Sequence, residues 1–402
     1  MSTKHNHPKR WLIIGLAVVL LVSYVAYILT EPLDVAQPTI TFTFSRPAKA
    51  VALTWPSYGE SAVGAVGYGV LASQGSNTPQ ATASVAKILT ALAVLKQHPL
   101  AVNEIGPMIT LTQADVDSYN TYVAEGGSVV RVMVGEQLSE YQALQALLIP
   151  SANNIAETLA RWAFGSIDAY NAYANSYAKD LGMTDTTITD PSGFLGTTVS
   201  TPHDLVILGE TALANPVVAQ IVDETTATIP VQGVIYNVNN LLGYDGIVGI
   251  KTGNNDQDQG CYLFAAKTNI GNQVVTVVGA IMGGPNLGTT MKDALPLIGS
   301  TVGGFSDISI INSGTSVASL KTAWGSQVSV DAQDNLSAVV WNNSATIASV
   351  DLSTIQPPLK INSQVGLLKI NNLTTHVVDS VPLVLKRAID GPSLIWRLIH
   401  GL

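Results

Sequence analysis

Three short motifs carry residue types that could together transfer an acyl group to a serine. They are Ser84-Val85-Ala86-Lys87, Ser151-Ala152-Asn153 and Lys251-Thr252-Gly253, which follow one another at intervals of about 65 and 100 residues. Each motif alone is weak evidence, because S-x-x-K occurs by chance in many chains of this length. The three motifs in this order are the components of a serine acyl-transfer site whose base is a lysine.

The first motif supplies a nucleophile and a base. A serine hydroxyl is a poor nucleophile at neutral pH and needs an adjacent base. Lys87 lies one helical turn after Ser84 and can be that base if its amine is neutral when the hydroxyl attacks. A second cation nearby would lower the pKa of Lys87 by like-charge repulsion, and Lys251 is the candidate.

The second motif can move protons and hold neighbouring groups. Ser151 can relay a proton between the lysines and the leaving amine. The side-chain amide of Asn153 can hold either Lys87 or the peptide group of the substrate. Both roles require that folding brings this motif next to the first one.

The third motif can bind the end of a substrate. Lys251 and Thr252 can bind a terminal carboxylate, and Gly253 lets the substrate backbone lie against the strand. A developing oxyanion needs two fixed N–H donors. The backbone amides of Ser84 and Asn254 are the natural pair.

Each of these residues also has a purely structural interpretation. Ser84 could cap a helix, Lys87 could be solvated, and Lys251 could extend along a sheet edge with its amine in water. Ser151 and Asn153 could form a helix N-cap pair. All of these would have to coincide in one chain, so we favour the catalytic interpretation.

The histidines indicate neither a different catalytic site nor a metal centre. His203 adjoins Asp204, but Pro202-His203-Asp204-Leu205 is typical of a helix start rather than of a Ser-His-Asp triad. The six histidines of the chain are scattered without metal-ligand spacing. We therefore expect no metal and no cofactor.

Apolar periodicity predicts the elements that must position the motifs. An apolar stripe at helical spacing follows Ser84 and places it in the first turn of a helix. The second motif falls between two helices and the third near the end of a strand. We expect further helices over 138–149, 154–163 and 289–298, and strands over 62–73 (a pair), 246–253, 261–268 and 273–282.

The part of the chain after residue 303 has a different character. Short alternating segments there predict a small all-β module, with strands over 317–324, 327–332, 337–341, 347–352, 366–371 and 376–384. Residues 392–402 predict a short amphipathic helix. We favour a capping tail over a membrane-surface contact for this helix.

Composition limits the class of protein. The apolar share of 47% is ample for two cores. The net charge of −9 argues against a nucleic-acid partner, because phosphate neutralisation needs clustered Lys and Arg. Cys261 is the single cysteine, so an intrachain disulfide cannot form. Its apolar surroundings predict a buried hydrophobic side chain rather than a reactive thiol.

The N-terminal segment predicts export. Residues 11–29 form an uncharged run of 19 residues, long enough to cross a bilayer. Basic residues precede the run, so the positive-inside rule keeps the N-terminus in the cytoplasm and exports the rest. A cleaved signal peptide, with secretion, is the alternative, and Val35-Ala36-Gln37 is an imperfect processing site. The length of the run favours an uncleaved membrane anchor.

These observations predict six regions along the chain. They are a cytoplasmic N-terminus (1–10), a transmembrane anchor (11–29), an extended linker (30–48), a catalytic domain (49–303), a β-rich C-terminal domain (304–390) and a short amphipathic tail (391–402).

Further segments follow in a characteristic order around the three motifs. They are residues 83–91, 147–156, Leu181-Gly182-Met183, Asp190-Pro191-Ser192-Gly193, Ser200-Thr201 and 240–253. With them, residues 55–284 resemble the serine-type D-alanyl-D-alanine carboxypeptidases, the low-molecular-weight penicillin-binding proteins of peptidase family S11. The β-rich C-terminal part is similar to the family's second domain in placement and size.

The resemblance implies both a fold and an activity. The fold is an α/β (α+β) DD-peptidase/β-lactamase-like fold, with a five-stranded antiparallel sheet between helices and a helical subdomain, followed by a small all-β domain. The activity is removal of the terminal D-alanine from peptidoglycan stem peptides ending in D-Ala-D-Ala, through an acyl-enzyme on Ser84 with Lys87 as general base. Covalent inhibition by β-lactams is also implied.

The chain departs from the family's pattern at one place. After Gly253 the family commonly has small residues and an Ala-Gly pair. Here stands Asn254-Asn255-Asp256-Gln257-Asp258-Gln259-Gly260. The acidic pair could alter which stem peptides fit, but no catalytic group is lost.

Three other functions remain as alternatives. A DD-endopeptidase that cuts peptide cross-links uses identical residues. A β-lactamase of the closest kind adds a glutamate about 35 residues after the second motif, and the corresponding residues 183–188 contain none. An inactive wall-binding scaffold is disfavoured by the intact motifs.

Overall fold

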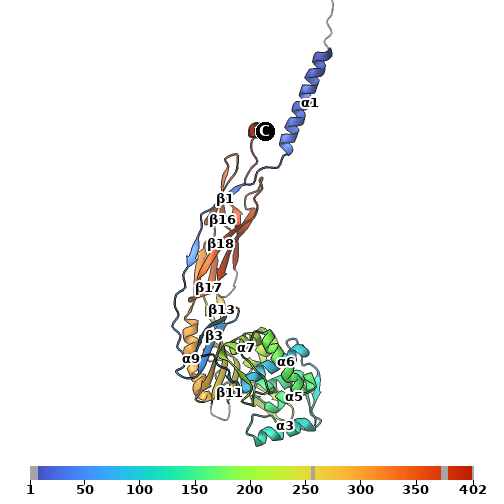
Figure 1. Ribbon diagram of the computed structural model, residues 1–402, viewed down its shortest axis with the longest axis vertical. Coiled ribbons are helices and arrows are strands. Elements are labelled where there is room, and N and C mark those ends of the chain that lie inside the picture. Colours follow the sequence, from blue (N-terminus) through green and yellow to red (C-terminus); the bar gives the residue numbers. More distant parts are fainter. Residues whose placement is uncertain (1–7, 255–258, 373–378, 401–402) are drawn as a thin grey trace, which may run out of the picture.

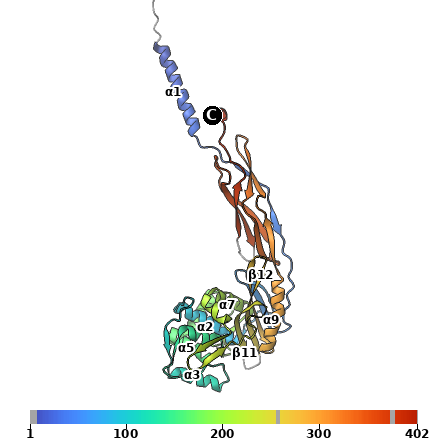
Figure 2. The same cartoon turned by 180° about the vertical axis from the view of Figure 1, so that it is seen from behind.

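The computed structural model describes residues 8–254, 259–372 and 379–400. The molecule is elongated: a separate helix, α1 (Pro8–Thr30), lies at one end, a β-rich region follows, and a mixed α/β region lies at the far end (Figure 1). The view from behind shows the same arrangement (Figure 2). The active-site motifs all belong to the α/β region.

A five-stranded antiparallel sheet forms the centre of the α/β region, with the strand order β11-β12-β13-β3-β4. Its strands are β11 (Ile247–Asn254), β12 (Gly260–Ile270), β13 (Gln273–Gly284), β3 (Glu60–Ala65) and β4 (Gly69–Gln74). The strands expected over 62–73, 246–253, 261–268 and 273–282 are therefore confirmed, and so is the predicted fold class.

Helices cover both faces of this sheet. On one face α9 (Leu287–Val302) packs on β12 and β13, burying Met291, Leu297 and Ile298. On the other face α7 (Pro202–Ala214) packs on β13 and β3 through Leu205 and Val206. The helix expected over 289–298 is α9.

A helical subdomain adjoins the face that α7 covers. Its central helix, α2 (Ala86–Gln97), buries every residue from Ala86 to Leu95, and all of these except Lys87 and Thr90 are apolar. Around it lie α3 (Gln113–Ala124), α4 (Glu140–Leu148), α5 (Asn153–Phe164), α6 (Ile167–Asp180) and α8 (Pro216–Asp223). The two helices expected on either side of the second motif are α4 and α5.

Short elements complete the α/β region. Three two-stranded pairs are β5 (Gln80–Ala81) with β8 (Val199–Ser200), β6 (Met108–Thr110) with β7 (Gln137–Ser139), and β9 (Thr226–Ile229) with β10 (Gly233–Tyr236). Two 3₁₀ turns are η1 (Ala83–Val85) and η2 (Tyr244–Gly246).

The β-rich region is built on a seven-stranded sheet with the order β1-β15-β16-β20-β19-β18-β2. Most strands match their predicted ranges: β15 (Ser316–Lys321), β16 (Gln327–Ala332), β17 (Leu336–Trp341), β18 (Thr346–Leu352), β19 (Gln364–Asn372) and β20 (Ser380–Leu385). Residues 376–378 of the last predicted strand lie outside the described residues. An additional strand, β14 (Phe305–Ile311), pairs with β17.

The segment expected as an extended linker, residues 30–48, is not free chain. It contributes β1 (Gln37–Ile40) and β2 (Phe44–Arg46), which pair with β15 and β18 at the two edges of the sheet. Only residues 41–43 separate these strands, so the two edges of the sheet come close together. An extended segment that contains proline suits an edge strand. Proline has no backbone N–H to donate to a second neighbouring strand.

Aromatic side chains join the two regions. The ring centroid of Phe305 in β14 lies 5.1 Å from that of Trp341 in β17 and 5.2 Å from that of Tyr68. The Tyr68 hydroxyl donates to the carbonyl of Val339 at 2.8 Å. These residues share one hydrophobic cluster with α9 and the five-stranded sheet.

The C-terminal helix α10 (Leu394–His400) ends beside the last turns of α1. The short amphipathic helix predicted over 392–402 is thus present, although residues 401–402 lie outside the described residues. The C-terminus therefore lies beside the end of α1 that is nearer the β-rich region (Figure 1).

Candidate active site

Ser84 lies in the 3₁₀ turn η1, which leads directly into α2. The sequence predicted this position at a helix start. Ala83 has a positive φ of 45°, an uncommon conformation for a residue with a side chain. Gly193 lies against this turn: a Cβ atom on Gly193 would sit 1.9 Å from the carbonyl oxygen of Ala83. The turn is therefore held in a strained conformation by close packing.

The amine of Lys87 joins the first motif to the second. Its Nζ lies 2.8 Å from Ser84 Oγ and 2.7 Å from Asn153 Oδ1. A third contact, of 2.8 Å, goes to the main-chain carbonyl of Ser192. The Lys87 side chain is 0% exposed, so water cannot replace any of these partners.

Burial determines the charge state of the two lysines. Removal from water lowers the pKa of Lys87 well below its ordinary value, and the charge of Lys251 lowers it further, whereas Asp190 raises it. Burial also lowers the pKa of Lys251, to about 7. The sequence named Lys251 as the cause of a low Lys87 pKa. In the structure Lys251 contributes, but desolvation is the larger cause.

Ser151 lies in the connection between α4 and α5, as predicted. It has a positive φ of 67° and is 4% exposed. Within the described residues, its Oγ has no hydrogen-bond partner. A buried hydroxyl without a partner is costly, and such groups are typical of functional sites.

Asn153 was expected in the same connection but is the first residue of α5. Its backbone N–H donates to the carbonyl of Ser128 at 2.7 Å, which fixes the helix start. The side chain is 3% exposed and directs its oxygen at Lys87. A helix N-terminus thus positions this amide more rigidly than a loop would.

The third motif lies on β11, the edge strand of the five-stranded sheet, as predicted. Lys251 is 2% exposed, and its Nζ donates to the carbonyl of Thr252 at 3.0 Å. A Cβ atom on Gly253 would lie 2.9 Å from the carbonyl oxygen of Thr82 and 3.1 Å from Ala83 Cβ. Only glycine therefore allows β11 to pack against the turn that carries Ser84.

Asn254, the last residue of β11, is exposed at the rim of this site. Its backbone N–H and that of Ser84 stay a prediction as oxyanion donors. The acidic pair that follows, at positions 256 and 258, lies outside the described residues.

Asp190 and the carbonyl of Ser192 also belong to the site, although neither was predicted to take part in it. The buried carboxylate of Asp190 accepts hydrogen bonds from Ser192 Oγ at 2.6 Å, Ser192 N at 3.1 Å and Phe194 N at 3.0 Å. Thr198 Oγ1 donates to its other oxygen at 2.5 Å. The carboxylate therefore shapes the turn that presents the Ser192 carbonyl to Lys87. The Asp-Pro-Ser-Gly run was a signal for a turn, but not for what the turn touches.

His203 and Asp204 form a helix start, as predicted. Thr201 caps α7 by accepting from the Asp204 N–H, and Pro202 occupies the first turn. The Asp204 carboxylate accepts from the backbone of Asp185 at 2.9 Å and from Thr186 Oγ1 at 2.8 Å. The pair thus has a structural role in holding α7.

Comparisons with known proteins agree with this geometry. The model of the peptidase S11 family, described as D-alanyl-D-alanine carboxypeptidase, matches residues 63–284, more than half of the chain. The D-alanyl-D-alanine carboxypeptidase DacB2 of Mycobacterium tuberculosis is 33% identical over 225 residues, covering 54% of this chain and 73% of that protein. A D-alanyl-D-alanine carboxypeptidase of a Streptomyces species is 28% identical over 246 residues, covering 57% and 81%.

Solved structures share the fold. A mutant of a Streptomyces DD-transpeptidase superimposes with a TM-score of 0.53 at 26% identity, covering 63% of this chain and 98% of that one. Penicillin binding protein 5 of Haemophilus influenzae superimposes with a TM-score of 0.58 over 85% of this chain and 99% of that one; its 17% identity supports the fold alone. As its motifs predict, the chain belongs to peptidase family S11, the serine-type D-alanyl-D-alanine carboxypeptidases.

Proposed function

We propose that this protein removes the terminal D-alanine from peptidoglycan stem peptides through an acyl-enzyme on Ser84, with Lys87 as the general base. The observation that carries the proposal is the fully buried Lys87 amine, 2.8 Å from Ser84 Oγ, with a pKa well below the ordinary lysine value. A neutral amine at that distance can accept the serine proton.

The contacts of Lys87 orient its lone pair. A neutral amine has two N–H groups and one lone pair. Asn153 Oδ1 and the Ser192 carbonyl can only accept, so they take the two N–H groups. The lone pair is then left for the hydroxyl proton of Ser84. This assignment supports Lys87 as the base more strongly than proximity alone does.

The reaction then follows in two steps. As Lys87 takes the proton, Ser84 Oγ attacks the carbonyl carbon of the penultimate D-alanine, and the backbone N–H groups of Ser84 and Asn254 hold the oxyanion. The C–N bond breaks, and the proton passes through the free hydroxyl of Ser151 to the departing D-alanine amine. Water then hydrolyses the ester and regenerates Ser84.

Lys251 and Thr252 complete the proposed substrate site. With a pKa of about 7, Lys251 can carry a proton when an anion arrives. It and Thr252 would bind the carboxylate of the terminal D-alanine, while the substrate backbone lies along Gly253 as an added strand on the edge of β11. β-Lactams, which present a carboxylate beside a reactive carbonyl, would acylate Ser84 and remain attached.

A DD-endopeptidase is the second candidate function. Two proteins named D-alanyl-D-alanine endopeptidases, from Pseudomonas aeruginosa and Escherichia coli, are 30% and 28% identical to parts of this chain. The proposed residues serve both reactions, because both break the same kind of amide bond. The two reactions differ only in the amine that leaves, which is free D-alanine for the carboxypeptidase and the D-amino acid end of a cross-linked peptide for the endopeptidase.

Release of D-alanine from diacetyl-Lys-D-Ala-D-Ala by the full-length chain in detergent tests the proposal. Ser84→Ala is expected to lower kcat by at least about 10³-fold. Ser353→Ala, which changes an exposed serine of the β-rich region, is the matched control and should leave kcat unchanged.

The two candidate functions give different results in this assay. Absence of D-alanine release together with Ser84-dependent labelling by fluorescent penicillin would favour the endopeptidase. Absence of both signals would contradict the acyl-enzyme proposal altogether.

We also propose that α1 anchors the protein in the cell membrane, with the catalytic domain (49–303) and the β-rich domain (304–390) outside the cytoplasm. Support comes from the apolar span Arg10–Thr30 and from the extracellular location of peptidoglycan. The intact mass of the mature protein tests this proposal. Loss of the first 30 or more residues would contradict it and support a secreted enzyme.

A further inference from the structure

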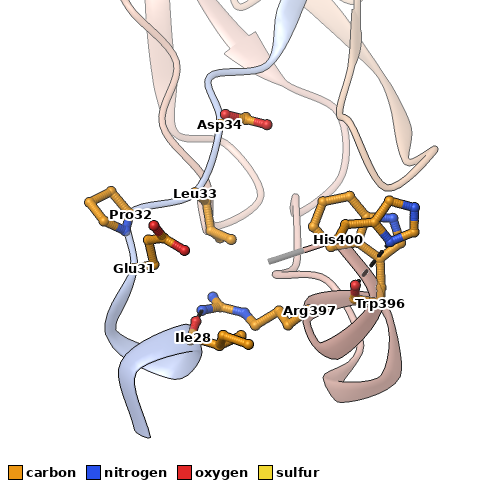
Figure 3. Close-up of a pocket in the computed structure, with 8 residues that line it drawn as sticks. All are labelled: Ile28, Glu31, Pro32, Leu33, Asp34, Trp396, Arg397 and His400. Atoms are coloured by element: carbon orange, nitrogen blue, oxygen red, sulfur yellow. Dashed lines mark hydrogen bonds between the residues drawn. The ribbon is translucent and has the colours of Figure 1, made fainter. Parts of the chain in front are cut away.

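A pocket lies between the C-terminal end of α1 and α10 (Figure 3), at the opposite end of the molecule from the α/β region (Figure 1). Its cavity is about 410 Å³, and the family match over 63–284 includes none of its lining. The catalytic function therefore leaves the pocket unexplained. The side chains that matter here are Ile28, Glu31, Asp34, Trp396, Arg397 and His400.

Arg397 connects α10 to the C-terminal end of α1. Its Nη1 donates to the carbonyls of Ile28 and Leu29, at 3.1 Å each, in the last turn of α1. Carbonyls at this end of a helix have no partner within the helix, so the guanidinium caps α1. Figure 3 shows the Arg397 side chain extending from α10 to α1 across the base of the pocket.

Aromatic contacts hold the other side of α10. The Trp396 ring packs edge-on against Trp324 of the β-rich region, with 5.9 Å between ring centroids. It also stacks on the His400 ring, with 4.5 Å between centroids. The helix is thus fixed between α1 and the seven-stranded sheet. The wall of the pocket that α10 forms is therefore held in place.

The depth of the pocket follows from the length of α1. The apolar span Arg10–Thr30 has 21 residues, which rise about 30 Å and match the hydrocarbon thickness of a bilayer. With α1 spanning the bilayer as proposed, Glu31 would lie at the level of the outer headgroups. On α10, Leu394, Ile395 and Ile399 are 55%, 69% and 65% exposed, as expected of side chains that face lipid rather than water.

The charges around the pocket have both signs. Glu31 and Asp34 supply two carboxylates, and neither forms an ion pair with another described residue. Arg397 uses one guanidinium nitrogen on α1 and keeps further N–H groups. A ligand with an anionic phosphate and a cationic amine complements this arrangement. An anionic lipid such as phosphatidylglycerol carries the same phosphate but no amine. Its negative charge would therefore lie near two carboxylates without a cationic group to face them.

We propose that this pocket binds the headgroup of a zwitterionic phospholipid with a primary amine, such as phosphatidylethanolamine, from the outer leaflet. The phosphate lies at Arg397, and the ammonium group lies between Glu31 and Asp34. Trp396 and the apolar residues of α10 contact the acyl chains beside it. The inference rests on the proposed membrane anchor, which the intact mass tests separately.

Native mass spectrometry of the full-length, delipidated chain in detergent tests the proposal. Phosphatidylethanolamine, phosphatidylglycerol and phosphatidylcholine with identical acyl chains, and inorganic phosphate, are the probes. We expect one phosphatidylethanolamine per chain, bound about tenfold more tightly than phosphatidylglycerol. Inorganic phosphate alone is expected not to bind.

Variants that remove the carboxylate charges without changing side-chain shape distinguish recognition of the headgroup from non-specific contact of α10 with lipid. Glu31→Gln with Asp34→Asn should remove the preference for phosphatidylethanolamine over phosphatidylglycerol. Glu125→Gln with Asp334→Asn, two exposed carboxylates elsewhere, should keep it. Labelling of Ser84 by penicillin should be the same in all of these chains.

Two results would overturn the proposal. One is equal binding of the three lipids by the unaltered chain, which means adsorption without recognition. The other is a lipid preference that survives the loss of both carboxylates. We expect neither result to bear on catalysis, because the residues that line the pocket are not among those of the active site.

Discussion

Lys87 is the residue on which the chemistry depends, and its surroundings make a specific prediction about pH. Because burial is the main cause of its lowered pKa and Lys251 the second, Lys251→Ala should raise the pKa of Lys87 without restoring the ordinary value. The base must be deprotonated to act, so the acid limb of the pH profile should move to higher pH. Substrate binding should weaken as well.

The pH dependence of Ser84 acylation by a fluorescent penicillin measures this shift. Lys267→Ala, which removes an exposed lysine of β12, is the matched control. If the acid limb stays in place in Lys251→Ala, Lys251 has no influence on the base and burial acts alone.

Gly193 makes a second prediction at the scale of one residue. Its φ of 71° favours glycine, and a Cβ would meet the carbonyl of Ala83 at 1.9 Å. Gly193→Ala should lower the free energy of unfolding by at least about 2 kcal/mol and displace Ser84. Gly196→Ala, where a Cβ meets nothing within 4 Å, should change little.

Thermal unfolding and penicillin labelling of both variants check this expectation. Normal labelling of a fully stable Gly193→Ala would show that the turn carrying Ser84 does not depend on this contact.

At the scale of elements, α4 begins with a buried carboxylate. Glu140 is 0% exposed, and within the described chain neither of its side-chain oxygens has a hydrogen-bond partner. Burial raises its pKa to about 7. The folded state therefore favours the neutral acid. The stability that this group contributes is full below the unfolded pKa of about 4.5 and is lost as the pH rises through about 7.

Glu140→Gln should remove this dependence. The glutamine stays neutral, so the variant should gain stability over the unaltered chain as the pH rises from 5 to 8, by about 1–3 kcal/mol at the upper end. Urea unfolding at several pH values measures the difference. A difference that is constant across this range would mean that Glu140 does not titrate in the folded protein.

The sequence predicted those elements whose patterns are local. The apolar stripe after Ser84, the proline-terminated helix before Ser151 and the alternating strands each carry their own signal. The edge strands within residues 37–46 could not be found this way, because their partners lie about 280 to 300 residues away in the chain. Pairing at such distances depends on the whole fold rather than on local propensity.

The site itself was predictable only in part. Side chains with reactive groups are visible in a sequence, and all three motifs meet or lie side by side in the fold. The Ser192 carbonyl is a main-chain group that every residue has, so no residue type marks it. Burial lowers the pKa of Lys87 more than the charge of Lys251 does. How deeply a side chain is buried depends on tertiary packing, so this order of causes could not be predicted from the sequence.

At the scale of the whole molecule, the segment between α1 and the catalytic domain is part of the β-rich domain. A chain that begins at Glu31 keeps β1 and β2, whereas one that begins at Ala48 loses both edge strands. The shorter chain should unfold at a lower temperature and expose a sheet edge that promotes aggregation. The longer one should match the full-length chain in D-alanine release and stability.

Differential scanning calorimetry and light scattering of the two truncated forms check this prediction. Equal unfolding temperatures would mean that the edge strands contribute nothing to the β-rich domain.

If α1 anchors the protein in a membrane, as proposed, the pairing of β1 with β15 would also decide how the molecule responds to a pull on α1. A pull on α1 reaches β1 along the strand axis, so its ladder of four paired residues is sheared as a unit rather than opened one bond at a time. The chain then turns through residues 41–43 into β2 on the opposite edge, and a second ladder must give way next. We therefore expect such a pull to open the edges of the seven-stranded sheet before it disturbs the turn that holds Ser84.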